Sequence, residues 1–345
     1  MRSYFLTVSL FTTCGIAMAQ LPPHLDLTAP EPLAAGPSQR PANCEVIYDS
    51  EQGQGWREIY GNPLPCCNVR RSDGLILDAL AVDDFDAERP GRITDAFIVA
   101  FSCTHCRGPA DGVRIYLWGT GEAPAEEPTG VWDIPPEQVQ SRSLGWWLAW
   151  EMEIHATALD IPFSEGRNWI TIQPRDWTQG ANSYYLVRDE RRPVQGADAF
   201  VKDGPDGEVP GYGFTDWRTA ESQGFGAADS YLRLEGCFDP MSIAVEGECG
   251  GSAQFSWSNA PAESTLTFLY ARNSGNVRVP PNLPCGGTQL GLGQRLLQVA
   301  FSVQTGEGTG MAERFLPAAA CSGYFQAIIR DATGPCEVSN VVGTP

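Results

Sequence analysis

Short apolar runs without a helical period alternate with turn-forming residues along most of this chain. Its 345 residues include 37 glycines and 27 prolines, which keep the apolar runs short. A strand needs only a few residues, whereas an amphipathic helix needs an apolar stripe over several turns, so the pattern predicts an all-β protein. In the first part of the chain we expect strands at residues 44–49, 75–82, 92–101, 112–118, 146–155, 168–173, 183–188 and 230–236, and a long loop at residues 119–143.

From residue 241 the runs carry fewer charges and are more regularly spaced. About seven short strands in roughly 100 residues are typical of an immunoglobulin-like sandwich. We therefore expect two tandem antiparallel β-sandwiches, a jelly-roll-like domain at residues 44–238 and an Ig-like domain at residues 241–345. The strands of the second domain are expected at residues 241–246, 253–257, 265–271, 296–303, 311–316, 324–330 and 337–342.

The N-terminus has the pattern of a secretory signal. Residues 1–19 begin with Arg2, continue through an apolar core and end in an Ala-Met-Ala cleavage site. Residues 20–43 hold six prolines and no apolar period, so we expect a disordered leader there. No later run is apolar over the roughly 18 residues that a transmembrane helix needs. The sequence therefore predicts a secreted, extracellular protein without a transmembrane segment.

The charge balance argues against a nucleic-acid partner. The chain has 42 acidic residues against 23 basic ones, and Lys202 is its only lysine. An acidic surface repels phosphate backbones, although a solvated surface is the simplest explanation of the acidity. The chain also lacks the G-x-S-x-G, H-E-x-x-H and P-loop motifs, which removes most support for nucleophilic, zinc-protease or nucleotide chemistry.

A polar segment interrupts the most strand-like stretch, residues 75–101, and we expect it to form a corner between two strands. Its carboxylates Asp83, Asp84 and Asp86 are oxygen ligands of the kind that Ca²⁺ takes, and residues 203–208 form a second acidic turn. Neither segment has the EF-hand spacing. The alternative is that the aspartates cap the turn through backbone hydrogen bonds. Calcium is the one cofactor that the sequence suggests.

The cysteine count favours disulfides. Removing the signal leaves an even number, which is typical of a bridged exported chain. We expect Cys44 to pair with Cys237. One or both of Cys66 and Cys67 are expected to bond to Cys103 or Cys106. The alternative is a zinc site of these four thiolates, in which His105 could replace one. The last four cysteines allow three pairings, of which we favour Cys249–Cys336 with Cys285–Cys321.

The stretch at residues 145–155 is the most suggestive of a ligand. One face of the expected strand is apolar, and the other carries Trp147, Glu151, Glu153 and His155. An exposed indole beside carboxylates suits a sugar ring. Two carboxylates at i and i+2 lie about 6.5–7 Å apart along a strand, which overlaps the separation in inverting glycosidases. A third interpretation is an ordinary solvated strand face.

The chain resembles a family of exported bacterial β-sandwich domains with an A-x-D-D-F motif, to which no activity is assigned. The resemblance covers residues 44–238 and rests on the motif at residues 81–85, the strands at 113–118 and 166–172, and the last strand into Cys237. The family's G-x-Y/W-W pattern is matched only in part, at residues 166–169. Residues 241–342 resemble a small C-terminal module of similar proteins, through residues 284–292 and 336–342. The resemblance implies a fold and export, and no reaction.

These observations favour a secreted, non-catalytic protein over an enzyme. We expect it to bind a glycan or a cell-surface component through Trp147, Glu151 and Glu153. A polysaccharide hydrolase that uses Glu151 and Glu153 is the alternative.

Overall fold

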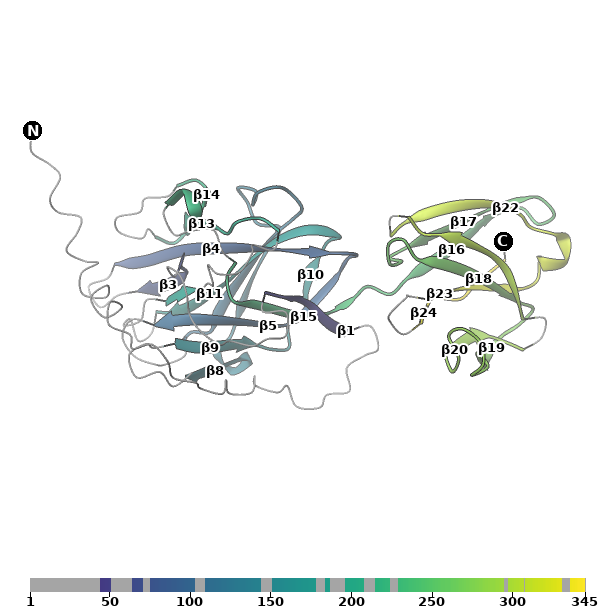
Figure 1. Cartoon of the computed structure of the whole chain (residues 1–345), viewed down its shortest axis with the longest axis horizontal. Helices are drawn as coiled ribbons and strands as arrows, with labels where there is room; N and C mark the ends of the chain where they lie inside the picture. Colours follow the sequence, from purple (N-terminus) through teal and green to yellow (C-terminus); the bar gives the residue numbers. More distant parts are fainter. Residues whose placement is uncertain are drawn as a thin grey trace, which may run out of the picture. The chain divides into compact units, whose positions relative to one another are not determined.

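The computed structural model describes residues 44–50, 64–70, 75–102, 109–143, 151–177, 184–186, 196–207, 215–223, 229–294, 297–306, 308–330 and 336–344. This part of the chain consists of strands and short 3-10 turns, which confirms the all-β prediction. It contains no helix with the length and apolar character that a membrane crossing requires. The chain divides into two compact units, Met1–Ala87 with Gly91–Cys237 and Glu88–Pro90 with Phe238–Pro345. Figure 1 labels many of their strands.

The described residues of the first unit form strands β1 to β15 and two 3-10 turns. They are β1 (Cys44–Asp49), β2 (Leu64–Pro65), β3 (Cys67–Arg70), β4 (Ile76–Ala87), β5 (Gly91–Ser102), β6 (Val113–Trp118), β7 (Gly130–Ile134), η2 (Pro136–Gln138), β8 (Val139–Ser143), β9 (Glu151–Ala156), β10 (Ile161–Phe163), β11 (Gly166–Asp176), β12 (Tyr184–Leu186), β13 (Phe200–Asp203), β14 (Arg218–Thr219), η3 (Glu221–Gln223) and β15 (Leu232–Phe238).

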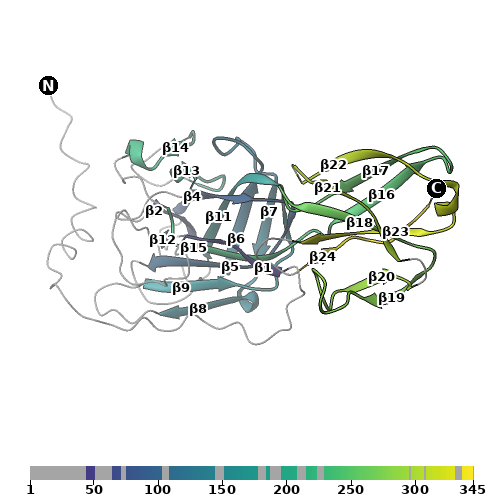
Figure 2. The ribbon, with the colours of Figure 1, turned by 45° about the vertical axis from the view of Figure 1, so that its right-hand side comes forward.

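Two sheets make up this unit. The eight-stranded sheet has the order β1-β15-β5-β12-β2, with β9 and β10 also paired to β5 and with β8 paired to β9. The seven-stranded sheet has the order β14-β13-β4-β3-β11-β6-β7, with an added β4–β11 pairing. Figures 1 and 2 show β4 and β11 in one layer and β5, β9 and β8 in another.

Strand β4 is buried on both faces over most of its length, although it carries aspartates as well as apolar residues. One of its faces, with Leu80 and Val82, packs in an aromatic cluster with Trp118 and Trp169. The expected polar corner is wrong, because Asp83 to Asp86 continue the strand as far as Ala87. The reversal takes only the three residues Glu88–Pro90.

Two further expectations for this unit are wrong. Residues 119–143, expected as a loop, contain the hairpin partner β7 and the edge strand β8. The sheets are also not purely antiparallel. Strands β3 and β11 pair in parallel, with Asn68 beside Arg175. Neither feature follows from local patterning, because both depend on partners distant in sequence.

The second unit contains all the remaining strands and one 3-10 turn. They are β16 (Ser242–Gly247), β17 (Ser252–Ser258), β18 (Thr265–Ala271), β19 (Ser274–Arg278), β20 (Gln289–Leu292), β21 (Gln298–Gln304), β22 (Gly310–Phe315), η4 (Ala318–Ala320), β23 (Tyr324–Arg330), β24 (Glu337–Val338) and β25 (Val342–Gly343). They form a three-stranded sheet β16-β17-β22, a five-stranded sheet β21-β18-β23-β24 with β25 on β23, and the hairpin β19–β20.

An aromatic core holds this unit together. Phe255 of β17 lies 5.4 Å, 4.9 Å and 5.0 Å, between ring centroids, from Phe268, Phe301 and Phe325. A second, smaller core joins Leu269 and Ile328 to residues of the β19–β20 hairpin, which the sequence did not predict. The hairpin therefore covers an apolar sheet face that water would otherwise reach.

Three disulfides cross-link the described residues. Cys44–Cys237 joins β1 to β15, as expected, and in the second unit the bridges are Cys249–Cys321 and Cys285–Cys336. The pairing that we favoured for the last four cysteines is therefore wrong.

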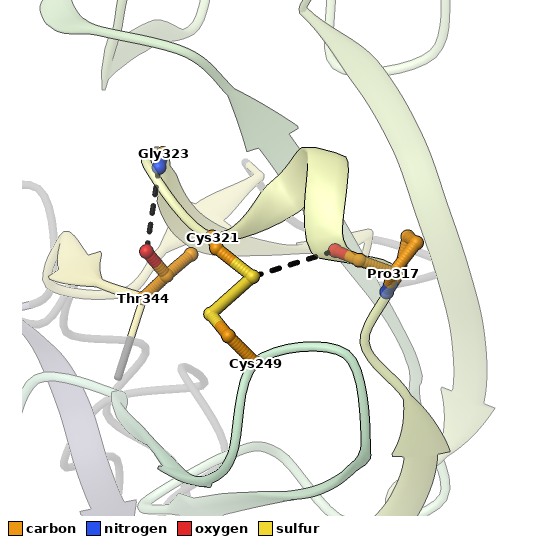
Figure 3. The surroundings of a disulfide bond; sticks show 5 residues. All are labelled: Cys249, Pro317, Cys321, Gly323 and Thr344. Carbon is orange, nitrogen blue, oxygen red and sulfur yellow. Dashed lines mark hydrogen bonds between the residues drawn. A yellow bond between two sulfur atoms is a disulfide. The ribbon is translucent and has the colours of Figure 1, made fainter.

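Backbone contacts explain the pairing. The β16–β17 turn and the end of β22 exchange two hydrogen bonds, Gly250 N to Leu316 O and Leu316 N to Gly251 O. These contacts bring Cys249 to the short turn that precedes Cys321. Figure 3 shows the bridge, with Cys321 Sγ also 3.7 Å from Pro317 O.

Candidate functional site

A surface cleft with an exposed tryptophan lies at one end of the seven-stranded sheet, and we call it the Trp177 cleft. Its volume is about 410 Å³. The indole of Trp177 is 36% exposed, more than any other tryptophan whose side chain the structure describes. The cleft is lined by Asp111, Asp133, Ile134, Pro135, Pro136, Arg175 and Trp177. It therefore combines a flat aromatic surface, apolar walls and charged groups.

Strand register brings the charged residues together. Arg114 of β6 lies opposite Asp133 of β7 and also opposite Gln173 of β11, two residues before Arg175. Residues two apart on a strand share a face, so Arg175 points to the same side as Gln173. Figure 2 shows β11, β6 and β7 in this order across the sheet. Three strands thus place two guanidinium groups around one carboxylate.

Hydrogen bonds fix the position of Trp177, which directly follows β11. Its backbone N–H donates to Asp111 Oδ2 at 2.5 Å, and its indole N–H donates to Asn68 Oδ1. Asn68 is within reach because β3 pairs in parallel with the end of β11. The Arg175 guanidinium carbon lies 5.9 Å from the centre of the indole ring. The indole is therefore oriented before any ligand arrives.

The acidic turn after β13 holds the side chains around Trp177 in position. Asp78, which is fully buried, accepts hydrogen bonds from Asp206 N at 2.6 Å and from Gln173 Nε2 at 2.7 Å. The carboxylate of Asp206 in turn accepts from Asn68 Nδ2 and Arg114 Nη1. The turn predicted as an acidic, cation-binding segment thus holds the side chains that position Trp177.

The electrostatics of the cleft keep its central carboxylate ionised. Asp133 accepts from Arg114 Nε at 2.6 Å, Arg114 Nη2 at 3.1 Å and Arg175 Nη1 at 2.9 Å. The hydrogen bonds that Arg114 donates to Asp133 lower the pKa of Asp133 below its usual range, and the same bonds raise the pKa of Arg114. Asp133 therefore stays negatively charged at any physiological pH.

The strand that we expected to bind a ligand is only partly described. Trp147 and the side chain of Glu151 lie outside the described residues, so their roles stay predictions. Glu153 and His155 are described, and the expectation that their face is solvated is wrong. Glu153 is 1% exposed and pairs with Arg142 at 2.6 Å. His155 stacks on Phe97 at 3.7 Å between ring centres.

Asp83, Asp84 and Asp86 of β4 do not converge on one point. Asp83 accepts from Ser230 N at 2.5 Å, whereas Asp84 accepts from Ala197 N at 3.1 Å and pairs with Arg167 at 3.0 Å. Residues 83 and 84 point to opposite faces of the strand. Among the described residues, no three Cys, His, Asp or Glu side chains gather closely enough to hold a metal ion. The contacts are those of carboxylates that fix neighbouring loops by backbone hydrogen bonds.

These buried carboxylates give a testable pH dependence. Burial raises the pKa of Asp84 to about 6, and burial together with Asp229 raises the pKa of Asp83. The folded protein binds these protons at a higher pH than the unfolded chain does, so the free energy of unfolding should fall as the pH rises from about 4 to about 6. The Asp84 contribution is about 3 kcal/mol at most.

Urea unfolding of Asp84→Asn against the wild-type protein at pH 4 to 7 measures that contribution. The difference in the free energy of unfolding between the two proteins should change between pH 4 and pH 7. Asp160→Asn, which removes an exposed carboxylate that pairs with Arg92, is the control and should leave the pH dependence as it is in the wild type. If the free energy of unfolding of Asp84→Asn changes with pH in the same way as that of the wild type, the raised pKa of Asp84 is contradicted.

The Cys66 cluster lies partly outside the described residues. The structure describes Cys66 as a buried thiol, where we expected a disulfide; its Sγ lies 3.4 Å from Thr171 Oγ1. Burial raises its pKa to about 11, which makes it a poor nucleophile. Residues 103–108, with the two expected partner cysteines and His105, are not described.

Few features of the sequence indicate the Trp177 cleft. Arg175 and Trp177 lie two residues apart, just after a predicted strand. This spacing is the one local signal for an exposed aromatic residue at that place. Asp111 precedes a predicted strand, and Asp133 lies in a segment predicted as loop. No family model matches the chain, and no curated protein is significantly similar to it. The resemblance to exported A-x-D-D-F domains therefore stays a prediction, and the site's geometry carries the functional argument.

Proposed function

We propose that this is an exported, non-catalytic protein that binds a glycan in the Trp177 cleft. The observation that carries the proposal is the half-exposed indole of Trp177, held at a fixed angle beside carboxylate and guanidinium groups. Pyranose rings present a C–H face that packs on aromatic rings, and hydroxyl groups that bond to charged side chains. Both kinds of contact are available within one cleft.

The dimensions of the cleft fit this ligand class. Its volume of about 410 Å³ lies in the range of small-molecule sites, roughly 300–1,000 Å³. Ile134 to Pro136 add an apolar wall, while Asp111, Asp133 and Arg175 supply acceptors and donors. Because these groups lie on strands and on a hydrogen-bonded turn, the protein loses little conformational entropy when a ligand binds.

The cleft is poorly suited to hydrolysis. A glycosidase needs one carboxyl group that is protonated near neutral pH, and the pKa of Asp133 is lowered by Arg114. Glu153, one of the two carboxylates that we considered for hydrolysis, is buried and paired with Arg142. The contacts therefore favour binding over turnover.

Export is supported by the signal pattern of residues 1–19 and by the three disulfides. Disulfides persist in oxidising compartments and are rare in the cytosol. An extracellular location also matches a glycan ligand.

Replacing Trp177 by alanine should abolish glycan binding. Truncating an aromatic anchor commonly costs about 2 kcal/mol or more, which is roughly thirtyfold in the dissociation constant. The measurement is affinity electrophoresis of the oxidised protein through gels that contain neutral polysaccharides (xylan, galactan, mannan or β-glucan), followed by calorimetric titration with oligosaccharides of the one that retards it.

Phe315→Ala is the matched control. Phe315 is an aromatic residue of the second unit and is 71% exposed, so its loss should leave both folding and binding as in the wild type. The proposal fails if no polysaccharide retards the protein, or if the retarded protein is insensitive to Trp177→Ala.

A further inference from the structure

One carboxylate that lines the Trp177 cleft, Asp133, engages two arginines: Arg175, which also lines the cleft, and Arg114 of β6. Oδ1 of Asp133 accepts from Arg114 Nε and Arg175 Nη1, and Oδ2 accepts from Arg114 Nη2. The remaining terminal nitrogen of Arg114 donates to Asp206 Oδ2 at 3.1 Å. All three nitrogens of the Arg114 guanidinium thus already bond to carboxylates of the protein.

These hydrogen bonds determine whether the cleft can bind an anionic sugar. Proteins bind carboxylate and sulfate groups most strongly through two parallel N–H bonds from one guanidinium. In this cleft an anion that takes two parallel N–H bonds from the terminal nitrogens of Arg175 would compete with Asp133, which already accepts from one of them. It would also approach the carboxylate of Asp111 and a chain with a net charge of −19.

An uncharged sugar meets no such obstacle. Its hydroxyl groups can donate to lone pairs of Asp133, whose side chain is 55% exposed, without breaking the ion pairs. Its C–H face can still pack on the indole of Trp177. The same arrangement that repels an anion therefore offers acceptors to a neutral ring.

We propose that Asp133 is a specificity-determining residue, which restricts the cleft to uncharged sugars by neutralising Arg114 and Arg175. The proposal rests on glycan binding at the Trp177 cleft. It predicts that the arginines become available to an anion when the charge of Asp133 is removed. Asp133→Asn does this with little change in shape, and its remaining oxygen can still accept from one arginine.

The test compares wild type, Asp133→Asn and Asp160→Asn on gels with two neutral and two acidic polymers. The neutral polymers are hydroxyethyl cellulose and whichever polysaccharide retards the wild type. The acidic polymers are carboxymethyl cellulose and polygalacturonate. Asp160 is an exposed aspartate that pairs with Arg92, so its variant controls for the lost charge. The ratio of acidic to neutral affinity should rise about tenfold in Asp133→Asn and stay within twofold in Asp160→Asn. The added acidic binding should vanish in Asp133→Asn with Trp177→Ala.

Two results would overturn the inference and leave glycan binding intact. One is Trp177-dependent binding of an acidic polymer by the wild-type protein. The other is an unchanged acidic-to-neutral ratio in an Asp133→Asn protein whose thermal unfolding is still cooperative. The absence of any polysaccharide binding would instead defeat the proposed function, so the two failures are distinguishable.

Discussion

Replacing Cys44 and Cys237 together by serine is expected to lower the free energy of unfolding of the first unit by about 5 kcal/mol. The bridge joins the first strand of the unit to its last and spans 193 residues of sequence. Its loss releases one of the longest loops that this chain can close, and in the chain-entropy model the unfolded state gains most from such a release. Since a folded domain is stable by only 5–15 kcal/mol, the loss is a large part of the total.

The measurement is guanidinium unfolding of the oxidised double variant, followed by tryptophan fluorescence. Nine of the ten tryptophans precede residue 238, so the signal reports mainly on the first unit. Val46→Ala is the control, because it changes an exposed residue of the same strand and keeps the bridge; it should cost less than about 0.5 kcal/mol. A loss below about 1 kcal/mol in the double variant would show that the bridge does not constrain the unfolded chain.

Phe255→Ala is expected to destabilise the second unit by about 3–5 kcal/mol. Phe255 is 2% exposed, and its ring lies within 5.4 Å of three other phenylalanine rings, measured between centroids. Its removal leaves a cavity that surrounding strands cannot close, because their positions are fixed by backbone pairing. For a domain of about 100 residues this loss lowers the melting temperature by roughly 15 °C or more.

Differential scanning calorimetry measures this effect. Phe315→Ala removes the same side chain from an exposed position of the same unit and should shift the melting temperature by no more than about 3 °C. If the two variants melt alike, the aromatic cluster is not the core of the unit.

The Trp177 cleft is held in place before a ligand binds. The Trp177 cleft is built from strand ends and from a turn anchored on the buried Asp78, with no part that must fold on binding. In the binding that we propose, the indole sets the affinity and the charge balance around Asp133 sets the selectivity. The two substitutions that we propose separate these roles.

The sequence by itself determined where several strands lie. Residues 44–49, 265–271 and 324–330 were predicted with the bounds that β1, β18 and β23 have in the structure. Alternating burial along a strand is a local property with a period of two, so it can be read from neighbouring residues. The Cys44–Cys237 bridge was also predictable, because these cysteines begin and end one domain.

Only the tertiary structure decided which of these strands meet. Glu153 has the pattern of a solvated position, yet β8 brings Arg142 against it and the residue is buried. The last four cysteines pair according to which turns lie side by side, and the sequence leaves three combinations open. The Trp177 cleft takes Asn68, Asp133 and Arg175 from strands far apart in the chain. Such pairings depend on contacts between distant segments, whose free energy no local pattern encodes.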